Sequence, residues 1–572
     1  MRIPTFACSQ LPTSLLVLLF TLLGGLPQHP STVVYAQDTP VLLNGITSFS
    51  INTSNRVLSF SLPSSAQPVV LSIELCTQVD GQDGPKFFVA ANTSPVTSRA
   101  TSRATSSTRT AGSSPSTAGP LDNSVEIDVS GGVGYWNSVN SLENGGSLQV
   151  QLDSTARGGP WRFTVGLSIR DPLHLRSDFT PLFGDSTGTS AVLFSPPLPG
   201  TSIPLEEPTF PKYELPDAIP VPPSPPSAAT STNNTLLVIP TTSLIGDDGY
   251  FRSNLTSSTC FLESLAVNAL NQPVVTNSSL VLVDQEEGWR TRYVVSGLQP
   301  QTNYTVYTIS TTLGQSNVVT LSQPAYFKTK TSGFGCTLVH SLPFCPKVAY
   351  AAPFPPLTGA AASTGYDSTN FPPGLQQQFV SSLGNFTASM KTFRCGQDLY
   401  SITQSCASCE RAYRDWLCSV LIPRCGEVDP SPDPNVGPID PPAALVARVM
   451  SSTNTTDSSP RVDQTVFGGG GAAVEQYNEL LPCLETCHAV DRACPPVVQW
   501  RCPRKQFGAE RSYAVGYVDN PGDDFSGGGV EGGGTTGRSQ DEFGNVWCNA
   551  IGFARARRRS DDGPRPSRVR QY

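Results

Sequence analysis

Charged side chains are scarce in this 572-residue chain, where they make up 14% of the residues against a usual share of about 25%. The formal net charge is −8. Because affinity for phosphates needs a concentrated positive field, this balance excludes bulk nucleic-acid binding and gives no general attraction to an anionic bilayer. Proline and glycine are abundant, with 52 and 49 residues. At about 150 residues per domain, the length predicts three to four domains.

Histidine is also scarce, and the familiar catalytic motifs are missing. None of the four histidines lies in an H-E-x-x-H pattern, and no G-x-S-x-G elbow or P-loop is present. Gly527-x-Gly529-x-x-Gly532 lies in a glycine-rich stretch rather than between a strand and a helix, and the acidic runs lack calcium-loop spacing. We therefore expect no enzyme, no catalytic residue, no metal site and no cofactor. The histidines, expected at surface or packing positions, are His29, His174, His340 and His488.

Long apolar runs are missing except near the N-terminus. Arg2 precedes the apolar stretch Leu15–Leu23, and small or slim residues at 34–36 would suit cleavage before Gln37. Residues 1–36 thus predict a secretory signal peptide, with an uncleaved signal anchor as the alternative. No other window approaches the ~18 to 20 apolar residues that cross a bilayer, so we expect a lumenal or extracellular chain that forms no pore by itself.

Cysteines and glycosylation sequons agree with the secretory pathway. Of 15 cysteines, Cys8 lies in the leader, and the remaining even number suits complete pairing in an oxidising compartment. N-x-Ser/Thr sequons recur along the chain and predict a glycosylated surface. The predicted acceptors are Asn52, Asn92, Asn233, Asn254, Asn277, Asn303, Asn385 and Asn454.

Apolar residues alternate with polar ones across the first third of the chain. Runs such as Leu58, Phe60 and Leu62 place apolar side chains on one strand face, so residues 37–195 predict a β-sandwich. Within residues 93–118, 15 of 26 residues are Ser or Thr, which predicts a disordered insert.

A proline-rich stretch separates this part from a second β-rich region. Residues 196–229 read as a semi-rigid linker, and residues 230–330 as a further β domain. The run ending in Asn303-Tyr304-Thr305-Val306 resembles the tyrosine corner of fibronectin type III domains, where the tyrosine hydroxyl bonds back to nearby backbone. Cys76 and Cys260 lie in different units, so they either bridge the two or stay free.

The last third holds most of the cysteines. Around 406–418 and 483–494 the helical period places cysteines on one face, which predicts a disulfide-stapled, helix-rich domain over residues 331–550. A zinc site built from C-x2-C and C-x3-C is the disfavoured alternative, because an oxidising lumen consumes thiols. The arginine-rich residues 551–572 read as a disordered basic tail.

The cysteine spacing Cys409-x8-Cys418-x6-Cys425, with Cys487-x6-Cys494, resembles the Frizzled-type cysteine-rich domain. Cys395 and Cys406 depart from that pattern and would form an extra bridge. The connectivity that the resemblance implies is Cys336 with Cys425, Cys345 with Cys418, Cys409 with Cys494, Cys483 with Cys548, and Cys487 with Cys502.

Leader, glycosylated β-rich half and cysteine-rich half together resemble the fungal Mid family of regulatory calcium-channel subunits. The resemblance implies an extracellular auxiliary subunit of a stretch-activated, calcium-permeable channel. It would be held at the plasma membrane, and also in the endoplasmic reticulum membrane, through a four-repeat voltage-gated-type pore subunit that docks on the cysteine-rich domain. The alternative is a secreted or wall-associated adhesion or receptor-like glycoprotein with a ligand-binding cysteine-rich domain.

Overall fold

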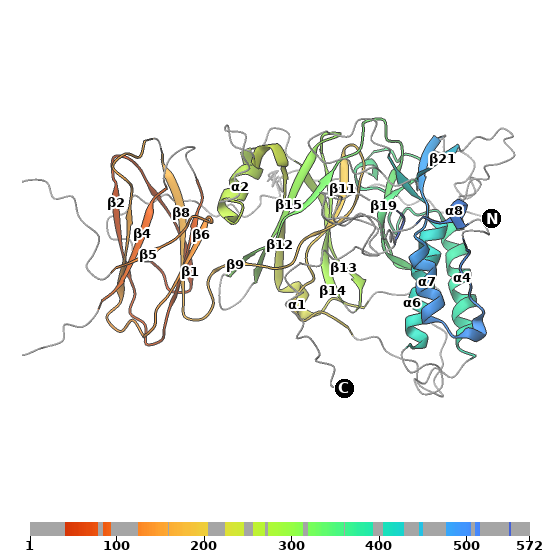
Figure 1. Cartoon of the computed structure of the whole chain (residues 1–572), viewed down its shortest axis with the longest axis horizontal. Coiled ribbons are helices and arrows are strands. Elements are labelled where there is room, and N and C mark those ends of the chain that lie inside the picture. Colours follow the sequence, from red (N-terminus) through yellow and green to blue (C-terminus); the bar gives the residue numbers. More distant parts are fainter. Residues whose placement is uncertain are drawn as a thin grey trace, which may run out of the picture.

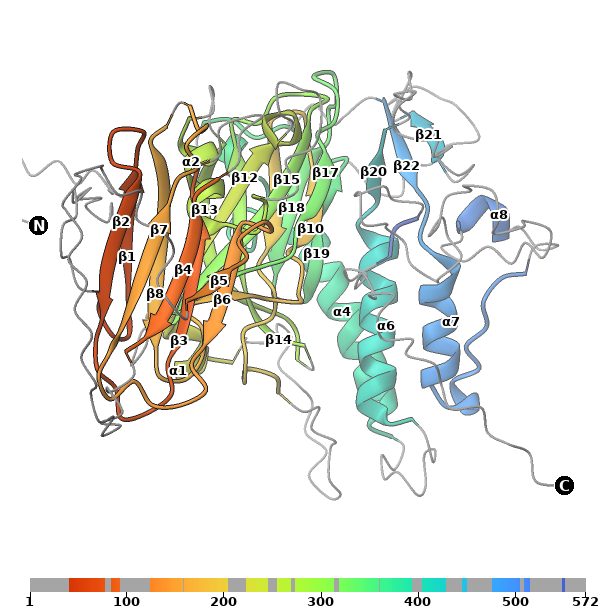
Figure 2. The ribbon, with the colours of Figure 1, turned by 60° about the vertical axis from the view of Figure 1, so that its left-hand side comes forward.

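The chain forms three parts that lie in a row. Figure 1 shows the N-terminal sheets at one end, a second β unit in the middle and the helices of the C-terminal half at the other end, and Figure 2 shows the same order. The computed structural model describes residues 41–77, 84–92, 124–157, 159–203, 223–244, 255–268, 273–285, 287–312, 318–359, 361–392, 404–427, 445–449, 476–504, 509–514 and 548–550.

The first part is a sandwich of two antiparallel sheets, called here the N-terminal sandwich. One sheet has the order β1 (Gly45–Ile51), β8 (Trp161–Ser168), β3 (Val70–Leu75) and β6 (Val133–Asn137). The other has the order β2 (Val57–Leu62), β7 (Gly146–Gln151), β4 (Lys86–Ala91) and β5 (Val125–Ile127).

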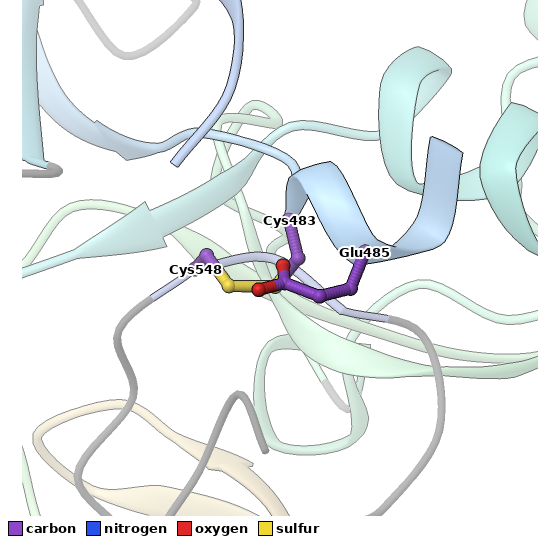
Figure 3. Close-up of side chains that lie close together, drawn as sticks. All are labelled: Cys483, Glu485 and Cys548. Atoms are coloured by element: carbon purple, nitrogen blue, oxygen red, sulfur yellow. A yellow bond between two sulfur atoms is a disulfide. The ribbon is translucent and has the colours of Figure 1, made fainter. Parts of the chain in front are cut away.

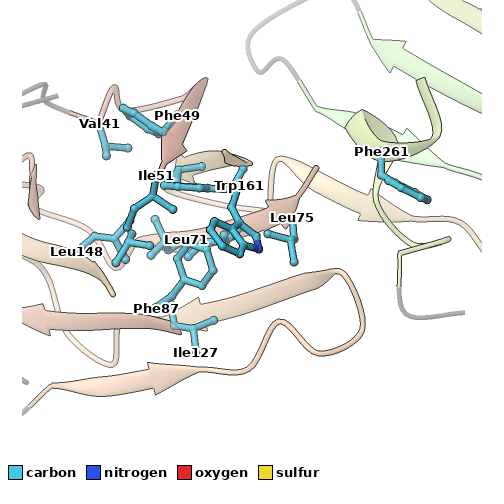
Figure 4. Packing of buried hydrophobic residues seen from close by; sticks show 14 of the residues in the cluster. Val41, Phe49, Ile51, Leu71, Leu75, Phe87, Ile127, Leu148, Trp161 and Phe261 are labelled. Carbon is cyan, nitrogen blue, oxygen red and sulfur yellow. The ribbon is translucent and has the colours of Figure 1, made fainter. Parts of the chain in front are cut away.

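Alternation along the strands builds the core between these sheets. In β2 every second residue is buried, which places Leu58, Phe60 and Leu62 inside and leaves the residues between them exposed. Aromatic rings meet across the core: the ring centroids of Phe49 and Phe60 lie 4.3 Å apart. Figure 4 shows this packing, with Phe261 joining from a separate helix. The prediction of a β-rich N-terminal region is confirmed.

The second part is another pair of sheets, called here the second β unit. One sheet has the order β12 (Thr232–Pro240), β15 (Asn303–Thr312), β16 (Val319–Leu321) and β9 (His174–Arg176), with β17 (Ala325–Lys328) also paired to β15. The other has the order β10 (Leu182–Ser186), β11 (Ser190–Phe194), β14 (Gly288–Ser296) and β13 (Val274–Asp284). Its helical segments are α1 (Ser227–Thr230), η1 (Thr241–Leu244) and α2 (Thr259–Asn268).

The predicted domain boundary at residue 195 is wrong. Strands β9, β10 and β11 precede that boundary, but β11 pairs with β14 and β9 pairs in parallel with β16. The proline-rich stretch is therefore a connection inside the second unit: Leu198 is buried, and its N–H donates to the carbonyl of Trp289 at 2.8 Å. Alternation identifies a strand but carries no information about which sheet it joins.

Tyr304 makes the hydrogen bond that its motif predicts. The N–H of Gln299 donates to the Tyr304 hydroxyl oxygen at 2.9 Å, and burial raises the pKa of Tyr304. Its ring stacks on Phe327, with centroids 5.4 Å apart. The residue staples the turn before β15 onto the sandwich core; the likeness to a fibronectin type III domain stays a prediction.

The C-terminal half combines helices with short strands. Its strands are the hairpin β18 (Thr337–Leu342) and β19 (Cys345–Ala352), and the sheet β20 (Arg424–Gly426), β22 (Gln476–Leu480) and β21 (Leu445–Val449). Its helical segments are α3 (Ala361–Thr364), α4 (Pro373–Met390), α6 (Cys406–Leu421), α7 (Leu484–Ala493), η3 (Pro496–Val498) and α8 (Ala509–Ser512).

Helix α6 begins where its sequence dictates. The Ser405 side chain accepts from the N–H of Ser408, and the Ser408 side chain accepts from the N–H of Ser405, so two donors at the helix start are satisfied. The buried face of the helix carries Cys406, Cys409 and Cys418. Amphipathic spacing therefore delivers three cysteines to the interior.

Candidate functional site

Disulfides hold the C-terminal half together. Among the described residues the bonds are Cys336–Cys425, Cys345–Cys418, Cys409–Cys494, Cys483–Cys548 and Cys487–Cys502. These are the five pairs that the Frizzled-type resemblance implies. Cys406 is also disulfide-bonded, whereas Cys395, its predicted partner, lies outside the described residues.

One group of potential metal ligands lies within this framework. Cys483, Glu485 and Cys548 place one ligand atom each within 4.8 Å of one another (Figure 3). The two sulfurs are bonded to each other, so they offer no thiolate to a metal. Cys409 and Cys487, the other members of the C-x2-C and C-x3-C pairs that the zinc alternative needs, are likewise oxidised. The disulfides exclude the zinc alternative.

The C-terminal half packs against the middle sheet of the molecule, a contact called here the C-terminal joint. Leu182, Val192 and Phe194 of the second unit share a buried cluster with Leu338 and Ala351 of the β18–β19 hairpin. Strands β10 and β11 are buried along their whole length because their other face fills the core of the second unit. The joint is thus a second apolar core.

A buried ionic group lies inside the C-terminal joint. The Asp185 carboxylate accepts from Lys330 Nζ at 2.6 Å and from Arg424 Nε at 3.0 Å. Its oxygens also accept from the N–H groups of Ser186 and Ala351. Burial by itself raises the pKa of Asp185, but Arg424 and Lys330 outweigh it and hold the pKa below its usual value. Asp185 therefore stays charged and ties both sides of the joint together.

A second ionic group lies at the edge of the same joint. Lys347 Nζ of β19 lies 2.9 Å from a carboxylate oxygen of Asp284 in β13 and 2.9 Å from one of Asp415 in α6. Burial alone lowers the pKa of Lys347, but the two carboxylates raise it above its usual value. One lysine thus connects the second unit with the hairpin and with α6.

The N-terminal sandwich meets the second unit at helix α2, a contact called here the N-terminal joint. Cys76, just after β3, is bonded to Cys260 in α2, which settles the alternative that the sequence left open. Beside this bond the Glu74 carboxylate accepts from the Thr259 hydroxyl at 2.6 Å and from the Thr259 N–H at 3.4 Å. An acid of the sandwich thus caps the first turn of a helix in the next unit.

His174 crosses the same joint in the opposite direction. It begins β9 of the second unit, but its Nδ1 lies 2.9 Å from the Ser72 hydroxyl and its Nε2 lies 4.0 Å from Glu74 Oε2, both in β3. Gly166 in β8 makes room for the ring, because a Cβ there would lie 3.3 Å from His174 Cε1. Burial lowers the pKa of His174 to about 4 and raises that of Glu74 to about 7.

Ser72, His174 and Glu74 have the residue types of a hydrolase triad, but not its accessibility. Their exposed fractions are 0%, 3% and 2%. A nucleophile must reach a substrate carbonyl, so this buried set serves packing rather than acyl transfer. The comparison with known proteins below agrees that the chain is not an enzyme.

The histidines that the structure describes lie at packing or surface positions, but the sequence did not indicate what they contact. His174 and His340 are buried, and burial lowers the pKa of His340 to about 4, while His488 is exposed on α7. His29 lies outside the described residues. No local pattern marks Glu74 or Asp185, since their partners are 185 and 239 residues away.

Aromatic side chains fill the space between the helices at the C-terminal end. Phe386 of α4 stacks on Tyr413 of α6 with centroids 3.7 Å apart, and Trp416 meets Trp500 edge to face at 4.6 Å. The Trp416 indole N–H donates to the Tyr513 hydroxyl at 2.8 Å. All four rings are partly buried and pack against the buried cluster between the helices, so they extend this core toward the surface.

The predicted glycosylation acceptors fall on accessible positions where the structure describes them. Of the predicted acceptors that the structure describes, only Asn385 lies on a helix of the C-terminal half, namely α4. Helices α6 and α7 carry none of the sequons. Asn254 and Asn454 lie outside the described residues; the described acceptors are Asn52, Asn92, Asn233, Asn277, Asn303 and Asn385.

Within the part of the chain that the structure describes, no helix combines the length and the apolar character needed to span a bilayer.

Comparison with known proteins identifies a family. The family described as "Mid1: Stretch-activated Ca2+-permeable channel component" matches residues 69–528. The chain is 33% identical over 436 residues to the stretch-activated cation channel MID1 of Cryptococcus neoformans, an alignment that covers 71% of this chain and 65% of that protein.

More distant relatives carry the same description. The stretch-activated cation channel yam8 of Schizosaccharomyces pombe is 28% identical, covering 40% of this chain and 41% of yam8. The stretch-activated cation channel MID1 of Saccharomyces cerevisiae is 27% identical, covering 37% of this chain and 35% of that protein. The aligned part thus spans less than two thirds of each relative. Among solved structures, a collagenase domain from Bacillus anthracis covers 23% of this chain with a TM-score of 0.16, which is too low to indicate a shared fold.

Proposed function

The chain belongs to the Mid1 family of stretch-activated, Ca2+-permeable channel components, and from this we propose that it is an extracellular auxiliary subunit that docks on a separate pore-forming subunit and supports calcium influx. The family match over residues 69–528 is the observation that carries the proposal. The partner is a four-repeat voltage-gated-type pore subunit. The chain is peripheral to the membrane through that partner, reaches the cell surface through the secretory pathway and carries glycans at its sequons.

The mechanism that fits the architecture is a rigid cap. Each joint combines apolar burial with an ionic or capping contact. Each disulfide restricts the unfolded chain and typically adds about 2 to 4 kcal/mol to the stability of the folded state. A cap of this kind presents a preorganised surface, which lowers the entropy cost of docking. The two buried joints, with Asp185 in one and the Cys76–Cys260 bond in the other, support this mechanism.

We place the docking surface on the α6–α7 side of the cysteine-rich half. The β18–β19 hairpin already packs on the second unit, so the helices at the far end of the molecule are the part that faces away from the other domains (Figure 1). Neither α6 nor α7 carries a sequon. On α7, His488, Asp491 and Arg492 are exposed, and Asp491 also lies 3.7 Å from Arg501 Nη1 in an exposed ion pair.

The proposal is tested by tagging the C-terminus, solubilising membranes in mild detergent and identifying co-purifying proteins by mass spectrometry. We expect a multi-span cation-channel subunit in stoichiometric amount. Recovery of the protein alone, mostly from medium or wall, would instead support the adhesion or receptor-like glycoprotein.

The docking surface has its own test. Reversing both charges on α7, with Asp491→Arg and Arg492→Glu, should reduce recovery of the pore subunit at least several-fold while export stays normal. Glu126→Arg, an exposed reversal on β5 at the opposite end, is the matched control and should leave recovery unchanged. Equal recovery with both variants would place docking elsewhere.

A further inference from the structure

The N-terminal joint holds an acid and a base that cross it in opposite directions. Glu74 reaches from β3 of the sandwich to the first turn of α2, and His174 reaches from β9 of the second unit between β3 and β8. Both side chains are buried, with Glu74 2% and His174 3% exposed, and His174 Nε2 lies 4.0 Å from Glu74 Oε2. The rigid-cap mechanism accounts for the disulfide beside them but not for this pair.

We propose that Glu74 and His174 form a proton-exchanging latch, which keeps the N-terminal sandwich fixed on the second unit while the surrounding pH changes. When the joint is closed the proton resides on Glu74; when it is open, in acid, the proton resides on His174. Closing the joint therefore moves one proton from the imidazole to the carboxylate and takes none from the solvent. This inference does not depend on the proposed function.

The two side chains have opposite pH dependences. Burial raises the pKa of Glu74 from 4.5 to about 7, so its contribution to stability is full below pH 4.5 and is lost as the pH rises to about 7. Burial lowers the pKa of His174 from 6.5 to about 4, so its contribution is full above pH 6.5 and is lost as the pH falls to about 4. Between pH 4.5 and 6.5 the two slopes cancel.

The groups around Glu74 and His174 do not remove this cancellation of the two pH dependences. Ser72 and Thr164 offer neutral hydroxyls to the two ring nitrogens of His174, and Thr259 donates to Glu74. The Tyr135 hydroxyl, on β6, donates to the His174 carbonyl at 3.0 Å. The charged groups that act on the site are Glu263 on α2, which raises the pKa of Glu74, and Arg176 on β9, which acts on Tyr135.

Single substitutions in the full chain test the latch. Glu74→Gln keeps an oxygen that accepts from Thr259 but removes the titrating carboxyl group, so only the pH dependence that comes from His174 remains. The stability of this variant relative to the wild type should therefore rise as the pH rises from 4.5 to 6.5. His174→Gln should show the opposite trend. Each difference amounts to up to tenfold in the folding equilibrium per pH unit. Denaturant midpoints at pH 4.5, 5.5 and 6.5 measure both trends.

The double variant is the matched control. Glu74→Gln with His174→Gln removes both slopes and should run parallel to the wild type across the same pH range. Opposite trends in the single variants with a parallel double variant support the latch. Single variants that both run parallel to the wild type, or that both change in the same direction, overturn it.

A measurement on the unmodified protein covers the case in which a variant does not fold. The Cε1 proton of each histidine is followed by nuclear magnetic resonance as the pH is lowered. The two buried rings, His174 and His340, should stay neutral down to about pH 4. A ring next to Ser72 and Thr164 that titrates near 6.5 overturns the latch.

Discussion

At the scale of single residues, burial has opposite consequences for two acids of this protein. Asp185 is enclosed with two cations, Lys330 and Arg424, and remains a carboxylate. Glu74 is enclosed with hydroxyl and amide donors, and burial raises its pKa to about 7. The same kind of side chain is thus a fixed charge in the C-terminal joint and a titrating group in the N-terminal joint, because the partners differ.

Asp185→Asn should weaken the C-terminal joint strongly. The substitution leaves the buried Arg424 and the partly buried Lys330 without their carboxylate, and removing one partner of a buried ion pair typically costs about 3 to 5 kcal/mol. The pKa of Asp185 is held below the ordinary 3.8, so its contribution is present above that pH and is lost as the pH falls below it. Denaturant unfolding should therefore show a large difference from the wild type at pH 7 that shrinks below about pH 3.8. Asp171→Asn, in an exposed turn, should behave as the wild type at both values.

At the scale of elements, the sheet that contains β10 and β11 is the centre of the molecule. One face carries Phe183 and Leu193 into the core of the second unit, and the other carries Leu182 and Val192 into the C-terminal joint. Between them, Gly184 lies at a break in strand register and lets β19 approach closely. A sheet with both faces buried leaves little room for any added atom.

Gly184→Ala should destabilise the protein by about 1 to 3 kcal/mol. A Cβ at this position would lie 2.5 Å from the Ala349 carbonyl oxygen, so the hairpin would have to move. Gly384→Ala is the matched control, since a Cβ there meets nothing within 4 Å on α4 and alanine is favoured in a helix by about 0.5 to 1 kcal/mol. Opposite signs in the denaturant midpoints are expected; equal effects would contradict close packing at β10.

At the scale of the whole molecule, the disulfides connect segments that are far apart in the chain. Cys409–Cys494 joins α6 to the end of α7 across 85 residues, and Cys76–Cys260 joins two units across 184. Loops of these sizes correspond to about 5 kcal/mol each in the chain-entropy description. The arrangement of the described parts therefore relies on disulfides, which in general form and persist in oxidising compartments.

Peptide mapping without reduction should recover Cys409 linked to Cys494. Cys409→Ser should then leave the protein retained in the secretory pathway, as followed by surface labelling and by the state of its glycans. The double variant Cys409→Ser with Cys494→Ser lacks the unpaired thiol, so retention of both variants would point to lost stability. Normal export of both would contradict a structural role for this bond.

The sequence by itself determined the local features of this protein. Alternation predicted that Leu58 and Phe60 are buried in a strand, and helical spacing predicted that Cys406 and Cys409 share one buried face. The turn motif before Tyr304 predicted its hydrogen bond to nearby backbone. Each of these follows from side chains a few residues apart, which the periods of strand and helix bring onto one face.

Only the tertiary structure decided how the parts join. It assigned β10 and β11 to the second unit and bonded Cys76 to Cys260. It also brought Asp185 within reach of Arg424, 239 residues later, and Glu74 within reach of Thr259, 185 residues later. Contacts at such separations arise from the closing of large loops, and no local period records which distant strand or charge will lie on the other side.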